Sequence, residues 1–226
     1  MTELESLKNT VNSMSTRLER LEDIEAIRRL HHAYGYFMDY CRYDDVIELF
    51  AQNGEAIFLS GVYKGHNSLA RMYKDFLGQI YTQGRTGPLY GFLADHHMMQ
   101  DIITVAEDGN TAQFRGRCYL TLGSHNSRPN MPELLPSQVY EGALYENSYV
   151  RENGVWKIQK LEYALQWQSL YEKGWAHTEV DLQPFTQTFP DSPIGPDTIL
   201  DEVQGLWPDR TPLAFHYGHP VTGKAL

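Results

Sequence analysis

The chain has 226 residues, 42% of them hydrophobic, which is enough for one well-packed core without requiring a second domain. Its net charge of −10 and pI near 5.3 argue against a nucleic-acid partner, because phosphate binding needs clustered Lys and Arg and none occur here. No apolar run approaches the length of a membrane span, and the N-terminus lacks the apolar stretch of a signal peptide. We therefore expect a cytoplasmic protein with no membrane partner.

Residues 1–23 carry an apolar heptad pattern of three repeats. Three heptads are marginal as an isolated helix, so this seam needs a surface that buries it. We expect that surface to be the same helix of another chain, which makes the protein a homo-oligomer (dimer or trimer). The alternative is a helix packed on the domain's own sheet. The seam residues are Leu4, Leu7, Val11, Met14, Leu18 and Leu21.

The stretch from Ile24 to Phe50 predicts a long helix, a break and a short helix. Apolar and aromatic residues recur three and four apart, which places Tyr34 and Met38 on the buried side of the long helix. Asp39 falls near the end of this helix, where a carboxylate is unfavourable to the helix dipole. The pair at positions 44 and 45, both Asp, predicts the N-cap of the short helix.

The remaining elements are a strand over 56–60, a helix over 67–80 and two long antiparallel hairpins. The first hairpin turns at 107–110, and the second joins 139–151 to 155–167 through Asn153-Gly154, a strong turn signal. A proline-bearing loop over 123–137 is expected to border the site. Residues 181–226 are too apolar for a disordered tail, so we expect them to wrap the domain or a neighbouring subunit, with one short helix over 198–206. Cys41 and Cys118 are expected as free, buried thiols.

This order of elements resembles the nuclear transport factor 2-like superfamily, and within it the SnoaL-like and scytalone dehydratase-like branch. The resemblance covers residue 24 to about residue 167 and implies an α+β fold: a cone-shaped, cystatin-like α+β barrel whose curved antiparallel sheet surrounds the N-terminal helices. The domain then spans 24–180, between the added heptad helix and the wrapping tail. The motifs that carry it are Ile24-x-x-Ile-Arg-Arg-Leu-x-x-x-Tyr34 with Asp39, Asp95-His-His97-Met-Met-Gln, Gly142-x-x-Tyr145 with Asn153-Gly-Val-Trp-Lys-Ile158, and Leu161-x-Tyr-x-Leu-x-Trp167.

The resemblance also implies an apolar pocket in which an Asp of the first helix, a His at a strand start and pocket tyrosines exchange protons. Asp39 and His97 match the first two positions. The family's second His has no match, since Gly116 or its neighbour falls there, and its Ser and Asn fall on Ala143 and Tyr145. The pocket-wall positions of the last strand fall on Tyr163, Leu165 and Trp167.

The residues themselves support a similar set of candidates. A His beside a carboxylate in an apolar cavity exchanges protons near neutral pH, so His97 and Asp39 are catalytic candidates; a structural His and a helix cap are the alternatives. The phenols of Tyr34 and Tyr145 and the carboxylate of Glu141 complete the catalytic set. Residues expected to contact a substrate are Met38, Phe58, Tyr163, Leu165, Trp167 and Arg117, although the alternation of the strand favours an outward position for Arg117.

No cofactor or metal is expected. The adjacent His pairs lack a third ligand at metal spacing, and the chain has neither a phosphate-cradling loop nor a nucleophile elbow. Chemistry by side chains alone favours proton transfer with elimination, isomerisation or carbon–carbon cleavage.

Fifteen tyrosines and an aromatic content of 12% favour a flat aromatic substrate. The long form of the chain is most similar to bacterial diarylpropane lyases of lignin-dimer breakdown. That resemblance implies a cofactor-free lyase in which an acid expels a benzylic hydroxyl, a phenol becomes a quinone methide, and formaldehyde is lost to leave a stilbene. Two alternatives remain: a dehydratase or a ring isomerase or cyclase with Glu141 as base, and a non-catalytic binding or scaffold subunit.

Overall fold

The computed structural model describes residues 2–129, 138–180, 182–202 and 205–226. The predicted loop over 123–137 therefore lies largely outside the described residues. The helical elements are α1 (Glu3–Asp39), α2 (Tyr43–Glu48), α3 (Gly65–Ala70), the π-helix η1 (Arg71–Gly78) and α4 (Gln79–Thr82). The strands are β1 (Phe50–Phe58), β2 (Gly61–Lys64), β3 (Phe92–Val105), β4 (Thr111–Ser124), β5 (Gln138–Glu152), β6 (Val155–Leu170) and β7 (Thr198–Ile199).

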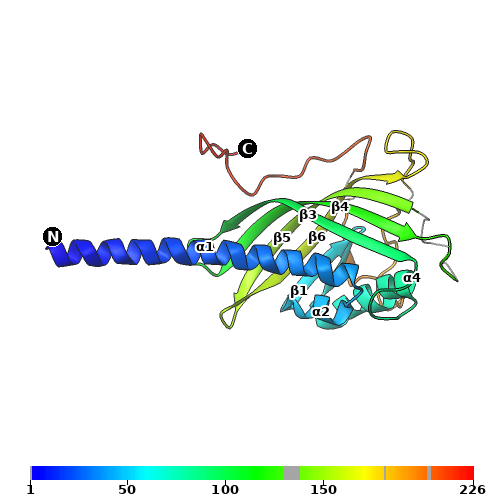
Figure 1. Ribbon diagram of the computed structural model, residues 1–226, viewed down its shortest axis with the longest axis horizontal. Helices are drawn as coiled ribbons and strands as arrows, with labels where there is room; N and C mark the ends of the chain where they lie inside the picture. The colour runs from blue at the N-terminus through cyan, green and yellow to red at the C-terminus, as the bar shows by residue number, and fades with distance from the viewer. Residues whose placement is uncertain (1, 130–137, 181, 203–204) are drawn as a thin grey trace.

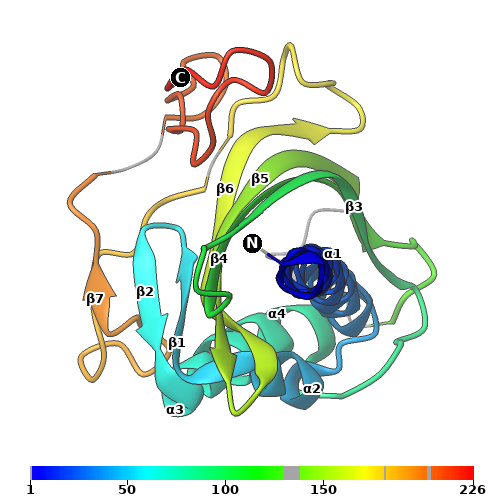
Figure 2. The same ribbon diagram turned by 90° about the vertical axis from the view of Figure 1, so that its left-hand side faces the viewer.

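The strands form one curved sheet in the order β3-β4-β5-β6-β1-β2-β7, and α1 lies inside its curve (Figure 2). The predicted α+β fold with a curved sheet around the first helix is confirmed. The sheet is mixed, however, because β1 pairs in parallel with β6. It also stays open, with β3 and β7 as its edges among the described residues, so no barrel closes.

The two predicted hairpins, β3–β4 and β5–β6, are present. Asn153 and Gly154 close the second one with φ of 51° and 81°. Two successive residues with positive φ are the requirement of the turn that matches the twist of a tight hairpin. These long hairpins supply the curved wall against which α1 packs.

The core lies between α1 and the concave face of the sheet. Ile27, His31, Tyr34 and Met38 are buried on one side of α1, as their spacing predicts. The segment from α3 through η1 to α4 runs beneath them as the floor (Figure 2). The short helix α2 begins after Arg42 rather than at an aspartate cap; the two aspartates lie in its first turn, where a carboxylate still favours the helix dipole.

The heptad segment continues without a break into the first helix of the core. Together they form α1, whose N-terminal half projects beyond the sheet (Figure 1). No helix among the described residues is long and apolar enough to cross a membrane.

The C-terminal tail lies along its own chain. Residues 198–199 form β7 against β2, so the helix predicted over 198–206 is wrong there: a backbone pairing with the sheet edge takes its place. Farther on, the carbonyls of Leu213 and Ala214 accept hydrogen bonds from Arg115, which also pairs with Glu146. Cys41 and Cys118 are buried and free, as predicted.

Candidate active site

Asp39, the last residue of α1, contacts His96 on β3. Its Oδ1 accepts a hydrogen bond from the backbone N–H of His96 at 2.9 Å and lies 2.6 Å from the ring Nδ1 of the same residue. Both side chains are largely buried, with 15% of Asp39 and 10% of His96 exposed. These contacts offset the unfavourable position of a carboxylate at a helix C-terminus. Because Nδ1 faces the carboxylate, Nε2 is the ring nitrogen that can exchange a proton with a ligand.

His97, the residue expected in this position, lies on the other face of β3. Its side chain is 51% exposed, its Nδ1 lies 3.3 Å from the carbonyl of Tyr119, and its nearest carboxylate is that of Asp95. The expected contact between His97 and Asp39 is therefore wrong, and His96 makes it instead.

A β-bulge explains the exchange of the two histidines. Met99 pairs with Arg117 and Ile102 with Arg115, so β3 contains one more residue than β4 over this interval. The extra residue lies near Gln100, whose φ is 52°. Side chains alternate between the two faces of a strand, so one extra residue inverts the alternation beyond it. If strict alternation is followed back from the buried Val105, it places His97 on the inward face. The extra residue in the strand shifts this position to His96.

A second polar group lies on the same concave face, on β5 and β6. The hydroxyl of Tyr163 donates to the Glu141 carboxylate at 2.8 Å, and the Gln168 amide donates to its other oxygen at 2.8 Å. Glu141 is 8% exposed. Burial raises the pKa of this carboxyl, and the hydrogen bonds from Gln168 and Tyr163 oppose the rise. The buried carboxyl can thus hold or release a proton near the concave face.

The two polar groups belong to one row across the sheet. His96 pairs with Leu120, Leu120 with Glu141, and Glu141 with Gln168. Two strand spacings separate the backbones of His96 and Glu141, which is about 10 Å. A small ligand on the concave face can therefore contact both groups.

The hydroxyls of Tyr34 and Tyr73 lie 3.2 Å apart in the core, and the ring of Tyr145 packs edge-on against Tyr34 at 5.9 Å and against Tyr163 at 5.2 Å. Burial raises the pKa of each of these phenols well above its ordinary value. They remain protonated at neutral pH, so each keeps a hydroxyl proton that it can donate in a hydrogen bond. The expected pair Tyr34 and Tyr145 is thus brought together, and Tyr73 joins it.

The neutral imidazole of His31 lies against this tyrosine cluster, with its ring centroid 4.9 Å from that of Tyr145. It is 1% exposed, and burial lowers its pKa to about 3. Its Nδ1 lies 3.4 Å from the Asn147 amide and 3.3 Å from the Tyr149 hydroxyl. The helical period alone places His31 inward, but no sequence signal identified its polar partners.

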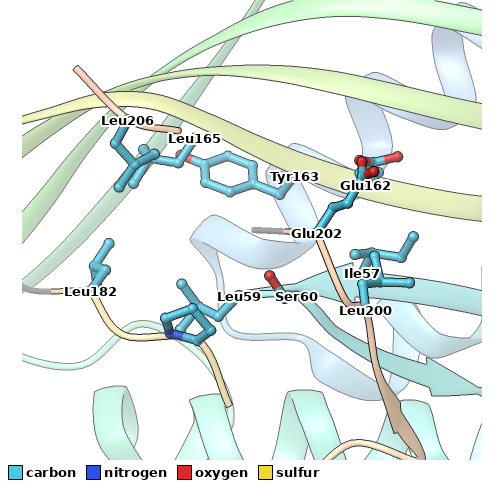
Figure 3. A pocket seen from close by; sticks show the side chains of 11 residues that line it. Ile57, Leu59, Ser60, Glu162, Tyr163, Leu165, Leu182, Leu200, Glu202 and Leu206 are labelled. Carbon is cyan, nitrogen blue, oxygen red and sulfur yellow. The ribbon is translucent and has the colours of Figure 1, made fainter. Parts of the chain in front are cut away.

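A pocket of about 100 Å³ opens where the β1–β2 turn, β6 and the tail meet (Figure 3). The ring of Tyr163 lies along its β6 wall, so the side chain that holds Glu141 also faces the pocket. Glu162 and Glu202 are its acidic residues, and Ser60 contributes a hydroxyl. The apolar lining comes from Ile57, Leu59, Leu165, Leu182, Pro184, Leu200 and Leu206.

The other residues expected to contact a substrate are dispersed. Met38 is buried in the core and Phe58 packs near Phe76, with ring centroids 6.3 Å apart.

Trp167 pairs with Gly142 and packs on Tyr119, in the same outward row as His97. Arg117 is exposed on this convex face, as its alternation predicts. The structure therefore places Tyr163 and Leu165 at the pocket and Trp167 and Arg117 away from it.

The site combines an oriented imidazole with a buried carboxyl, and both are groups that transfer protons. Within the ranges that the structure describes, no three side chains of the types His, Cys, Asp and Glu converge on one point as metal ligands. His96, Gln168 and Tyr73 belong to the site but were not among the site residues expected from the sequence.

The sequence and the fold of this chain resemble those of known proteins. Residues 19–162 match the model of the SnoaL-like domain family. A hexachlorocyclohexane dehydrochlorinase shares 17% identity and a TM-score of 0.54, over 76% of this chain and 97% of the other. A protein of Novosphingobium aromaticivorans, assigned provisionally as a scytalone dehydratase, shares 16% identity and a TM-score of 0.54, over 75% and 97%.

A Mycobacterium tuberculosis protein of unknown function shares 15% identity and a TM-score of 0.52, over 69% of this chain and 78% of its own. Likenesses at this level of identity show the common fold. No curated protein matches the sequence. The family match spans well over half of the chain, and the protein therefore belongs to the SnoaL-like domain family.

Proposed function

We propose that this protein is a cofactor-independent enzyme that eliminates a small leaving group from an aromatic substrate, with His96 and Asp39 as the acid–base pair. The observation that carries the proposal is the 2.6 Å contact between Asp39 Oδ1 and His96 Nδ1, on the same face of the sheet as the buried carboxyl of Glu141. A carboxylate that holds Nδ1 fixes the imidazole's orientation and supports its protonated form when Nε2 accepts a proton. Two structural neighbours are named for eliminations, a dehydratase and a dehydrochlorinase, which is consistent with this chemistry.

Elimination needs one group that protonates the leaving group and another that removes a proton. Protonated His96 can supply the first proton, and Asp39 stabilises its charge. Glu141 is the second proton-transferring group, because burial and hydrogen bonding set it apart electrostatically from the exposed carboxylates. The buried phenols, which stay protonated, orient substrate oxygens by donating hydrogen bonds.

For the substrate we propose a phenolic 1,2-diarylpropane-1,3-diol of the kind derived from lignin. Protonation by His96 expels the benzylic hydroxyl as water, and loss of the phenolic proton gives a quinone methide. Removal of the carbinol proton then releases formaldehyde, and the electron pair of the broken carbon–carbon bond returns the quinone methide to the phenol. The products are a stilbene, water and formaldehyde, so atoms and electrons balance without a redox cofactor.

The size of the pocket sets a condition on this proposal. Its volume of about 100 Å³ is smaller than the roughly 300 Å³ at the lower end of sites for drug-sized ligands. Tyr163 lines this pocket and holds Glu141, whereas His96, Asp39 and Glu141 are not among its lining residues. A substrate with two rings that reaches from the pocket to these groups needs more room, and we expect the tail residues Leu182, Leu200 and Leu206 to move outward when it binds.

The test is to mix the protein with such a diol and to follow stilbene absorbance and free formaldehyde together. Both products should form in equal amounts. His96→Ala should lower kcat by about 10²- to 10⁴-fold, the usual contribution of a general acid or base. His97→Ala, a matched change one residue away on the other face, should stay within about threefold of the wild type.

Loss of activity in His97→Ala with a normal His96→Ala would contradict the assignment of the acid. Binding of the diol without either product would contradict the lyase reaction and leave a second candidate, isomerisation or cyclisation of a ring substrate. The buried Glu141, held by the phenol of Tyr163, favours this second candidate, because a carboxyl of raised pKa beside a phenol suits proton transfer next to a carbonyl. Failure to bind any aromatic compound would favour a non-catalytic role.

A further inference from the structure

The apolar heptad seam of α1 is exposed along its whole length. Each of its six side chains is between 55% and 65% exposed, although each occupies a heptad position. The helix around them is continuous from Glu3 to Asp39 and projects beyond the sheet (Figure 1). A helix that bears a regular apolar seam in water normally buries it against a partner helix. The seam residues are Leu4, Leu7, Val11, Met14, Leu18 and Leu21.

The seam faces away from the body of its own molecule. Leu18 and the buried Ile27 are nine positions apart, which at about 100° per residue is roughly half a turn. The body-facing side of the same segment is already occupied: Arg20 bonds the carbonyl of Val105, and Asp23 pairs with Arg151. The seam therefore cannot pack on its own sheet while α1 remains one helix. A partner can lie along it without meeting the body of the same chain.

The charges that flank the seam suit a second copy of this helix. In a parallel pair with the three apolar repeats aligned, Glu3 faces Lys8 of the other copy, and Arg17 faces Glu22. Both charged pairs are of opposite sign, and such flanking pairs select the partner and its direction in two-stranded coiled coils.

We propose that two copies of this chain associate through residues 4–21 of α1 as a two-stranded coiled coil. The partner that covers the seam is a second copy of this chain, because the flanking charges are self-complementary and because the seam repeats without interruption over three heptads. The proposal is independent of the proposed activity, since no residue of the site lies in this segment.

Sedimentation velocity over a series of concentrations, with far-UV circular dichroism as a check on the fold, tests this association. The wild type should reach twice the 26.0 kDa mass of the chain. Leu7→Lys/Leu18→Lys places like charges inside the seam and should raise the dimer dissociation constant at least a hundredfold. Asn12→Lys/Thr16→Lys adds the same charge to the same helix away from the seam and should leave the dimer intact.

A wild type that remains monomeric at every concentration would overturn the proposal. An oligomer that persists in the Leu7→Lys/Leu18→Lys variant would also overturn it, because the copies would then meet elsewhere, for example through the convex face of the sheet. Equal dissociation of both Lys variants would show that net charge rather than the seam controls association, and this outcome too contradicts the coiled coil.

Discussion

His96 and His97 are neighbours in the chain, yet only His96 reaches the concave face and Asp39. The difference lies in which face of β3 each side chain occupies, and the bulge near Gln100 decides it. The sequence predicted a His and the helix aspartate as a pair, and it placed Tyr34, Tyr145 and Glu141 toward the interior. It could not choose between two adjacent histidines, because no residue type near Gln100 signals an extra residue in the strand.

His31 leads to a prediction about pH and stability. Its folded pKa of about 3 lies below the ordinary 6.5 because burial disfavours the charged ring. Below pH 6.5 the unfolded chain binds a proton that the folded chain does not, so the free energy of unfolding falls as the pH falls. Between pH 7 and pH 5 the wild type should lose about 2 kcal/mol more than His31→Gln, which carries no titrating ring.

Urea unfolding of both proteins at the two pH values measures this difference. His177→Gln, at an exposed position, is the control and should lose as much as the wild type. An equal loss in wild type and His31→Gln would show that the imidazole is not held neutral in the core.

At the scale of elements, the bulge in β3 has the largest effect on the candidate site. Without it, His97 would point inward and the Asp39–His96 contact would not form. The helices and hairpins around it follow from the sequence, because their apolar periods, the Asn153-Gly154 turn and the break after Asp39 are local signals. The bulge follows from pairing with β4, which is a non-local interaction.

The effect of a substitution at Gln100 on stability should depend on how readily the new residue adopts a positive φ, and not on its polarity. Its φ of 52° lies in the left-handed region, which is costly for β-branched residues. Gln100→Val should lower the free energy of unfolding by about 1–2 kcal/mol, whereas Gln100→Gly should change it by less than about 1 kcal/mol. Gln113→Val, on an extended and exposed part of β4, should stay within about 0.5 kcal/mol.

Chemical denaturation of the three variants provides the comparison. If Gln100→Val were as stable as Gln113→Val, the left-handed conformation at the bulge would be wrong, and with it the explanation for the inward position of His96.

At the scale of the whole molecule, the tail is fastened across the floor and the edge of the sheet. Asp197 accepts hydrogen bonds from the Arg71 guanidinium at 2.5 Å, the Ser68 hydroxyl at 2.9 Å and the Lys64 backbone at 2.7 Å. Arg71 also donates to the carbonyl of Gly195 at 2.8 Å. These contacts anchor the segment that lines one side of the pocket, which Tyr163 also lines.

Arg71→Met removes the charge and keeps much of the side-chain volume. Asp197 then loses its ion pair while remaining largely covered, so the free energy of unfolding should fall by about 2 kcal/mol. Limited proteolysis should cut within 182–202 at a rate at least tenfold above the wild type. Lys74→Met breaks an exposed pair with Asp44 and should cost less than about 0.5 kcal/mol.

Cleavage of both variants at the wild-type rate would show that Arg71 does not hold the tail. Faster cleavage in Lys74→Met as well would assign the effect to the helix itself rather than to the contact with Asp197.

The sequence by itself determined the elements whose signals are local: the helical period of α1, the turn of the second hairpin, the heptad seam, and thus the α+β class. Tertiary structure alone decided that His96 rather than His97 meets Asp39, that residues 198–199 pair with β2 instead of forming a helix, and that α1 presents its seam away from the body. Each of these depends on pairing or packing between segments far apart in the chain, and a local pattern cannot record the register of such contacts.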